Sequence, residues 1–348
     1  MKLISRAAAI LTFVQQDPRP DPDPIALEKI MTAAQLPDLP KVAHITEVGP
    51  RDGLQSEPVF IPTDRKIALV QAMVDAGLKR IEVSSFVSPR AVPQLRDAAE
   101  VIDAFADNED LFLTALVPNL KGAERAVQTG VDGLILFASA SKSHNAKNVN
   151  RTPEESLAGF GEIARFMEGT GIEVEGAIAT AFGCPFEGVV PVEDVVNMAK
   201  GYYNLGMRHV TLGDTTGMAT PALVTERIEA LRSALPDLEI ALHFHNTRGV
   251  GLVCAYAGLQ HGIVHFESSI AGLGGCPFVP RATGNICTED LVYMLTESGV
   301  ETGIDLEKLI LAAQLAEALV GRELPGQIMK AGPRLKTAAM HTVATANG

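Results

Sequence analysis

Short apolar or β-branched runs alternate with longer amphipathic segments from residue 43 onward. Eight of the short runs predict strands, at residues 43–49, 80–86, 111–117, 133–139, 173–182, 209–215, 239–245 and 264–272. Amphipathic segments predict helices at residues 62–77, 93–106, 153–171, 191–206, 221–235, 251–262, 288–299 and 305–321. Several of these segments begin at proline or an acidic turn and end in glycine, as helices do.

Strands that alternate with helices of this length predict parallel βαβ units. Eight units are the number in a closed (β/α)8 TIM barrel. A doubly wound open sheet is the alternative, but the G-x-G-x-x-G turn typical of it does not follow the first strand. We expect an N-terminal extension at residues 1–40, a catalytic barrel at 41–325, and a short C-terminal helical tail at 326–348.

The extension carries an apolar run at residues 7–14, preceded by Lys2 and Arg6. A signal peptide would be followed by a small-residue cleavage site, whereas here a stretch rich in proline and aspartate follows. We therefore interpret it as a short helix and a linker. No apolar run approaches the ~18–20 residues that cross a bilayer, so we expect no membrane partner.

Composition narrows the possible partners. The net charge of −13 argues against a nucleic-acid surface, which usually has a basic excess, but a local basic cluster can still bind an anionic small ligand. The four cysteines form no C-x-x-C pair, which argues against a structural zinc site and favours reduced thiols in a cytoplasmic protein.

Polar residues gather where the predicted strands end, which is where TIM barrels carry their chemistry. Those at the ends of the first, second, sixth, seventh and eighth strands are Glu47, Arg51, Asp52, Gln55, Glu82, Ser84, Ser85, Asp214, Thr215, His243, His245, Asn246, Cys276 and Asn285.

His243 and His245 stand two positions apart, so both imidazoles should point to the same face of their strand. A single strand histidine is usually a core residue, but this pair favours a metal site. With Asp52 and Asn285 it forms a set of two nitrogen and two oxygen ligands suited to Mg²⁺ or Mn²⁺, or to Co²⁺ or Zn²⁺. Two octahedral positions would remain for the hydroxyl and carbonyl oxygens of a substrate.

Two further features have open interpretations. Cys276, in "GGCP", is either an inert turn cysteine or a thiol on a loop that closes over the site. Residues 139–152 predict a loop with Lys142, His144, Lys147 and Arg151. It is either solvated or a contact for the phosphates of a large anion, and Asn148 belongs to the same stretch.

Seven motifs together resemble the 3-hydroxy-3-methylglutaryl-CoA lyase family, a branch of the divalent-metal aldolase and Claisen-condensing barrels. They extend over roughly residues 43–325 and read "EVGPRDGLQSEP", "IEVSSFVSPRAVPQL", "KNVNRT", "GCPFEG", "LGDTTG", "HFHNTRG" and "AGLGGCPFVPRATGNICTEDLVYML".

The resemblance implies a role for each matching position. The implied metal ligands are Asp52, His243, His245 and Asn285. Arg51 would stabilise the enolate oxygen of the thioester, and Cys276 would be the catalytic cysteine of a mobile glycine loop. Polar residues surrounding the site would include Glu82, Gln55 and Asp214, with Thr215 beside it.

The implied reaction is a retro-Claisen cleavage of an acyl-CoA. His243 or Asp52 would take the proton of the 3-hydroxyl, and the C2–C3 bond would break to give acetyl-CoA and a ketoacid, which is acetoacetate for the methylglutaryl ester. Cys276, or a group that it positions, would return a proton to the acetyl carbon. The family also implies a homodimer.

The chain departs from the family's usual pattern around the acyl group. Asn246 and Arg248 stand where the family has aspartate and tyrosine, and Pro58 replaces a lysine. Val279, Pro280 and Arg281 replace a more flexible segment of the loop, because proline fixes φ. We hypothesise that the lyase chemistry is retained while the acyl group differs, with Arg248 and Arg281 contacting it.

Two other functions compete with this one. A Claisen-condensing synthase of the same superfamily usually carries a regulatory C-terminal domain, whereas only about 25 residues follow the predicted barrel here. A non-enzymatic barrel that only binds acyl-CoA would not need the ligand set or Cys276. A lyase for a citramalyl-type or longer 3-alkyl ester remains within the favoured class.

Overall fold

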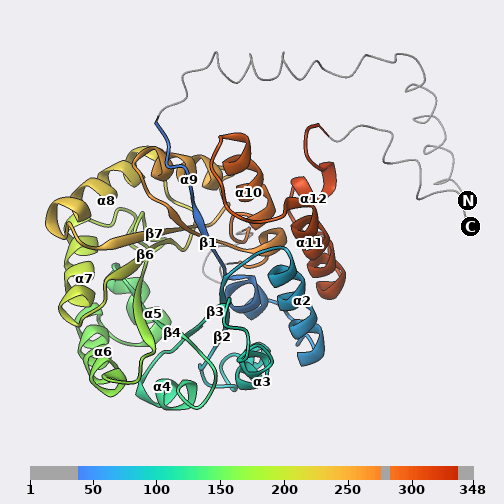
Figure 1. The fold of residues 1–348 in the computed structure, drawn as a ribbon. Coiled ribbons are helices and arrows are strands. Elements are labelled where there is room, and N and C mark those ends of the chain that lie inside the picture. Colours follow the sequence, from blue (N-terminus) through green and yellow to red (C-terminus); the bar gives the residue numbers. More distant parts are fainter. Residues whose placement is uncertain (1–37, 276–282, 336–348) are drawn as a thin grey trace, which may run out of the picture. The chain divides into compact units, whose positions relative to one another are not determined.

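The computed structural model describes residues 38–275 and 283–335, and these residues form a closed barrel of eight parallel strands. Each strand pairs with the next in sequence, and β1 closes the barrel against β8 (Figure 1). The strands are β1 His44–Glu47, β2 Arg80–Ser85, β3 Phe112–Leu116, β4 Gly133–Ser139, β5 Glu173–Ala179, β6 His209–Asp214, β7 Glu239–Phe244 and β8 His265–Ser268.

Helices form a ring outside the strands, as Figure 1 shows. They are α2 Thr63–Asp75, α3 Ala98–Asp103, α4 Leu120–Ala126, α5 Lys142–Val149, α6 Pro153–Met167, α7 Val192–Asn204, α8 Pro221–Ala234, α9 Gly251–Gln260, α10 Thr288–Glu297, α11 Leu306–Val320 and α12 Ile328–Ala331. Three short turns, η1 Gly49–Gly53, η2 Pro93–Leu95 and η3 Ile270–Gly272, complete the elements. The predicted (β/α)8 barrel is confirmed, and the open sheet is wrong.

Local sequence explains where helices begin. Helix α6 starts at a capping box in which Thr152 accepts from the Glu155 amide while the Glu155 carboxylate accepts from the Thr152 amide. Its buried positions, including Phe160, Ile163 and Met167, lie on one face, which packs against the barrel. None of the helices among the described residues is long and apolar enough to span a membrane.

The predicted loop at residues 139–152 is wrong in part, because residues 142–149 form helix α5. Ser141 caps this helix by accepting from the His144 amide, and Asn150 ends it in the left-handed conformation (φ 54°). The polar composition of the segment concealed the helix, although a serine at its start was the available signal. The expected extension lies almost wholly outside the described residues, and the division at residues 40 and 325 stays a prediction.

A cavity of about 870 Å³ opens at the N-terminal end of the barrel, opposite the strand ends that carry the predicted site. The rings of His44 and His209 both contact that of His265, with centroids 5.1 and 5.3 Å away. Burial and these two neighbouring rings lower the pKa of His265 to about 4, against the opposing effect of Glu239.

This cluster predicts acid sensitivity. Between about pH 6.5 and pH 4 the unfolded chain binds more protons at His265 than the folded chain does, so the free energy of unfolding falls as the pH is lowered through this window. His265→Phe keeps a ring but removes the titration, and we expect a shallower fall in urea-unfolding experiments. Parallel curves for the two proteins would contradict this.

Candidate active site

The first part of the site is turn η1, a single π-helical turn that follows β1 and carries Arg51 and Asp52. Turns of this type are frequent at functional sites. The amide of Asp52 donates to the carbonyl of Val48 at 2.7 Å. Gly53 is required by close approach, since a Cβ there would lie 2.7 Å from Cβ of Leu273, in the segment after η3. The sequence "GPRDG" therefore brings the turn against the connection that follows β8.

Arg51 is buried between two carboxylates. Its Nη1 donates to Asp52 Oδ1 and its Nη2 to Glu82 Oε2, both at 2.7 Å. Burial alone would lower the pKa of Arg51, but these two carboxylates raise it, so the guanidinium stays charged. Its buried Nε has no acceptor among the described residues. One N–H of a fixed cation is thus left without a hydrogen bond among the described residues.

Glu82 reaches this position from β2, beside a register shift between Glu82 and Ser84 in the pairing with β3. Such bulges re-aim side chains and are frequent near active sites. Burial raises the pKa of Glu82 to about 7, with Arg51 opposing this and the carboxylates of Glu267 and Asp52 adding to it.

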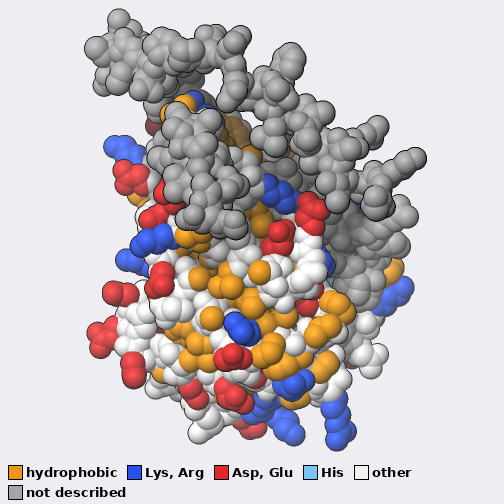
Figure 2. Space-filling view, turned by 90° about the vertical axis from the view of Figure 1, so that its right-hand side faces the viewer, with side chains coloured by type: hydrophobic (Ala, Val, Ile, Leu, Met, Phe, Trp, Pro, Cys, Tyr) orange, Lys and Arg blue, Asp and Glu red, His pale blue; other side chains and the backbone are white. Residues whose placement is uncertain are grey.

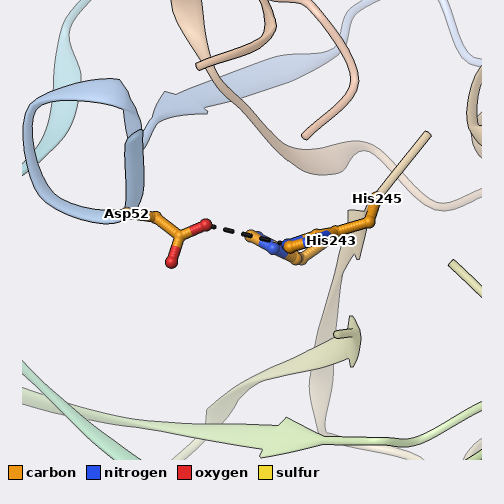
Figure 3. Close-up of side chains that lie close together, drawn as sticks. All are labelled: Asp52, His243 and His245. Atoms are coloured by element: carbon orange, nitrogen blue, oxygen red, sulfur yellow. Dashed lines mark ion pairs between the residues drawn. The ribbon is translucent and has the colours of Figure 1, made fainter. Parts of the chain in front are cut away.

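The two histidines lie together as predicted, with ring centroids 5.3 Å apart. Figure 3 shows both at the end of β7, facing Asp52 from the turn after β1. Asp52 Oδ2 lies 3.7 Å from His245 Nε2, and one ligand atom from each of the three residues lies within 4.8 Å of the others. Burial would raise the pKa of Asp52, but Arg51 and the histidines hold it well below its usual range.

Asn285 joins this group through an isolated antiparallel bridge between its backbone and that of His245. Its Nδ2 donates to Asp52 Oδ2 at 2.8 Å and to the Leu273 carbonyl at 3.1 Å. Its buried Oδ1 has no hydrogen-bond partner among the described residues, and neither does His245 Nδ1. Such unpaired buried acceptors beside a carboxylate fit a divalent cation. The structure therefore holds a candidate metal site of Asp52, His243 and His245, with Asn285 Oδ1 as a fourth ligand and second oxygen donor.

Two buried carboxylates support the segment that leads toward Cys276. Glu47 accepts from the Ile270 amide at 2.8 Å, and Glu289 accepts from the Ala271 amide at 2.9 Å. Ala271 has the left-handed φ of 54°, a strained conformation that these bonds stabilise. Burial raises the pKa of Glu47 to about 7 and that of Glu289 to about 8.

Close packing continues at Gly274, the first residue of the double glycine. Its φ is 122°, and a Cβ there would lie 2.8 Å from Nδ2 of Asn285. The backbone at Gly274 thus packs directly against Asn285, one of the candidate metal ligands. Cys276 and Arg281 lie outside the described residues.

Some side chains predicted to contact the substrate, on and just after β6, form hydrogen bonds within the protein. Asp214 Oδ1 accepts from the amides of Met218 and Ala219, and burial raises its pKa. The Thr215 hydroxyl accepts from the Thr180 amide. Gln55, which follows η1 in the sequence, has a half-buried side chain. Asp214 therefore has a structural role in the loop after β6, in addition to any contact with substrate.

Basic side chains flank the same end of the barrel. Lys147, Asn148 and Arg151 are exposed on α5 and just after it, and the Lys147 ammonium lies 3.6 Å from the centroid of the Phe186 ring. Arg248, also exposed, donates through Nη1 to the carbonyls of Thr216 and Gly217.

The sequence reasoning missed Glu267, on β8. Its Oε2 lies 2.9 Å from Nδ1 of His243, and its Oε1 accepts from the Thr211 hydroxyl at 2.7 Å. The two-residue periodicity that selected the histidines would have revealed it, because β8 pairs with β7 so that Glu267 stands beside His243.

Comparison with known proteins gives a consistent result. A family model described as HMGL-like matches residues 43–316. The chain is 42% identical to hydroxymethylglutaryl-CoA lyase YngG of Bacillus subtilis, over 83% of this chain and 96% of that one. It is 40% identical to the cytoplasmic 3-hydroxy-3-methylglutaryl-CoA lyase of Mus musculus, over 88% and 89%. An HMG-CoA lyase from Acinetobacter baumannii, solved with coenzyme A and 3-methylmalate, superposes with a TM-score of 0.81 at 45% identity, covering 85% and 97%.

Proposed function

We propose a specific reaction for this chain, which belongs to the HMGL-like family and is a carbon–carbon lyase of the hydroxymethylglutaryl-CoA lyase type. The substrate is a 3-hydroxy-3-methylglutaryl-CoA-like ester, and the products are acetyl-CoA and a ketoacid. The observation that carries the proposal is the convergence of Asp52, His243, His245 and Asn285 beside Arg51 at the C-terminal end of the barrel.

The cofactor in this proposal is Mg²⁺ or Mn²⁺, held by Asp52, His243, His245 and Asn285. A divalent cation supplies Lewis-acid chemistry there, polarising a carbonyl and lowering the pKa of a bound hydroxyl. In this proposal Asp52 or His243 accepts the proton of the 3-hydroxyl, and Asp52 takes that role when both ring nitrogens of His243 are engaged.

Arg51 acts when the C2–C3 bond breaks and negative charge develops on the thioester oxygen. In this proposal its buried Nε, which has no acceptor among the described residues, is a preorganised donor held by the contacts of the guanidinium with Asp52 and Glu82. Cys276 would then deliver a proton to the acetyl carbon. Lys147, Asn148 and Arg151 would contact the coenzyme A moiety, since the exposed cations Lys147 and Arg151 suit its phosphates and the Asn148 amide can donate to them.

Arg248 and Arg281, the two arginines assigned to the acyl group of the substrate, support a substrate that differs from the methylglutaryl ester. Arg248 donates through Nη1 to the carbonyls of Thr216 and Gly217 in the loop after β6, and its Nε and Nη2 would donate to an anionic group. Arg281 would approach the same group. The A. baumannii lyase was solved with 3-methylmalate and coenzyme A, which supports a hydroxy-acid thioester as the class of substrate.

An ester panel tests this proposal. Purified protein with Mg²⁺ or Mn²⁺ is assayed for acetyl-CoA release from methylglutaryl, longer 3-alkylglutaryl and citramalyl-type CoA esters. We expect turnover of an ester other than the methylglutaryl one to be fastest, with loss of activity on chelation and in Cys276→Ala. Equal or better turnover of the methylglutaryl ester would reject the altered acyl group, and condensation without cleavage would favour a synthase.

The assembly in this proposal is a homodimer located in the cytoplasm. Figure 2 shows apolar side chains gathered on the face that carries α2 and α11. On α11, Leu311 is 65% exposed and stands one and two turns before the half-buried Leu315 and Leu319. The buried cysteines Cys184, Cys254 and Cys287, which are not in disulfide bonds, support a cytoplasmic location. Sedimentation equilibrium gives the mass in solution and tests the dimer.

A further inference from the structure

Glu267 lies on the inner surface of the barrel, where it contacts the candidate metal ligand His243 but is not itself one of the candidate ligands. It is the β8 partner of His243 in the parallel ladder, so its carboxylate lies beside the imidazole. Its side chain is 15% exposed and that of His243 is 10% exposed, so water competes little for their contact. The 2.9 Å bond joins Glu267 Oε2 to Nδ1 of His243.

We propose that Glu267 is the positioning residue that fixes the ring and the tautomer of His243 for metal binding. An ionised carboxylate can only accept, so the proton of the neutral imidazole must be on Nδ1. The lone pair is then on Nε2, which becomes the nitrogen available to the cation. Ligating histidines generally donate their other N–H to such a partner, which orients the ring and raises its basicity. This inference rests on the proposed metal-dependent function.

Thr211 gives the carboxylate a second fixed contact. Its hydroxyl donates to Glu267 Oε1 at 2.7 Å from β6, the strand on the other side of β7. With one oxygen held by Thr211 and the other facing His243, Glu267 has a single orientation across the barrel. Thr211, Glu267 and His243 thus form a chain of hydrogen bonds across three adjacent strands, ending at the metal site.

Replacement of Glu267 by glutamine preserves shape but not the direction of the hydrogen bond. If Thr211 still donates to the amide oxygen, the amide nitrogen faces Nδ1 of His243, and that nitrogen must then accept. The proton moves to Nε2, which can no longer bind a cation. Glu267→Gln is therefore a sharper test than truncation, because it alters the tautomer without opening a cavity.

The test measures metal binding rather than turnover. Metal-stripped wild type, Glu267→Gln, Thr211→Val and Glu175→Gln are titrated with Mn²⁺, with free Mn²⁺ followed by electron paramagnetic resonance. Glu175 is the matched control, a buried inward carboxylate on β5 that pairs with Arg80. We expect Glu267→Gln to weaken Mn²⁺ binding about 10–100-fold, as loss of such a partner does. We expect a smaller loss in Thr211→Val and none in Glu175→Gln.

Nitrogen-15 spectra of the histidine side chains supply a signature that a purely structural role would not change. Nδ1 of His243 should carry the proton in the stripped wild type and lose it in Glu267→Gln, while thermal unfolding shows both proteins folded. Unchanged Mn²⁺ affinity in Glu267→Gln, or an equal loss in Glu175→Gln, overturns the positioning role and leaves the lyase proposal intact. Absence of Mn²⁺ binding by wild type overturns both.

Discussion

Replacing Arg51 by glutamine is expected to lower kcat by about 10²–10³-fold, the usual effect of removing one preorganised donor from a developing oxyanion. The KM for the CoA ester should change far less, because Arg51 is buried beneath the rim and the proposed coenzyme A contacts lie elsewhere. The measurement is steady-state release of acetyl-CoA at saturating Mn²⁺. Saturation matters because Arg51 also neutralises Asp52, a proposed metal ligand.

A second arginine on the barrel interior gives the control. Arg80 pairs with Glu175 at the opposite end of β2, so Arg80→Gln also removes a cation from the inner surface. It should reduce stability, because it leaves a mostly buried carboxylate unpaired, but kcat per folded molecule should stay near that of wild type. Arg51→Lys should recover only part of the loss, because lysine cannot reproduce the two-sided contact with Asp52 and Glu82. Equal kcat losses in Arg51→Gln and Arg80→Gln would contradict the assigned role.

Periodicity made much of this architecture predictable. All eight strands are confirmed because buried parallel strands are short, β-branched and separated by capped amphipathic helices. The same rule placed His243 and His245 on one face, since the two-residue repeat of a strand is independent of the rest of the fold.

Contacts between segments that are distant in the sequence were harder to predict. Asn285 meets His245 through a backbone bridge that joins residues 40 positions apart, and its place after the eighth predicted strand indicated a ligand but not this contact. The hydrogen bonds of Glu47 and Glu289 to the backbone after β8 depend on how that segment bends, including the left-handed Ala271, which no local pattern predicts. Helix α5 was missed because its residues are polar and its stability depends on caps such as Ser141.

Removing the metal is expected to have the largest effect on activity. Chelator-treated wild type should lose essentially all turnover, and Mg²⁺ or Mn²⁺ should restore it. His245→Ala should lower activity on the order of 10³-fold or more, because a bound cation contributes several kcal/mol of charge stabilisation and each ~1.4 kcal/mol corresponds to a factor of ten. The restored wild type and the variant are compared by acetyl-CoA release across a Mn²⁺ titration.

The variant also changes the balance of charge around Asp52. His245 Nε2 lies 3.7 Å from Asp52 Oδ2, and its loss leaves that oxygen with the Asn285 amide as its hydrogen-bond donor among the described residues. High Mn²⁺ should therefore rescue His245→Ala only in part, because the cation would have one fewer nitrogen ligand. His209→Ala, which removes a histidine at the far end of the barrel, is the control and should keep normal metal dependence. Chelator-resistant turnover, or His245→Ala activity within threefold of wild type, would refute a catalytic metal at this site.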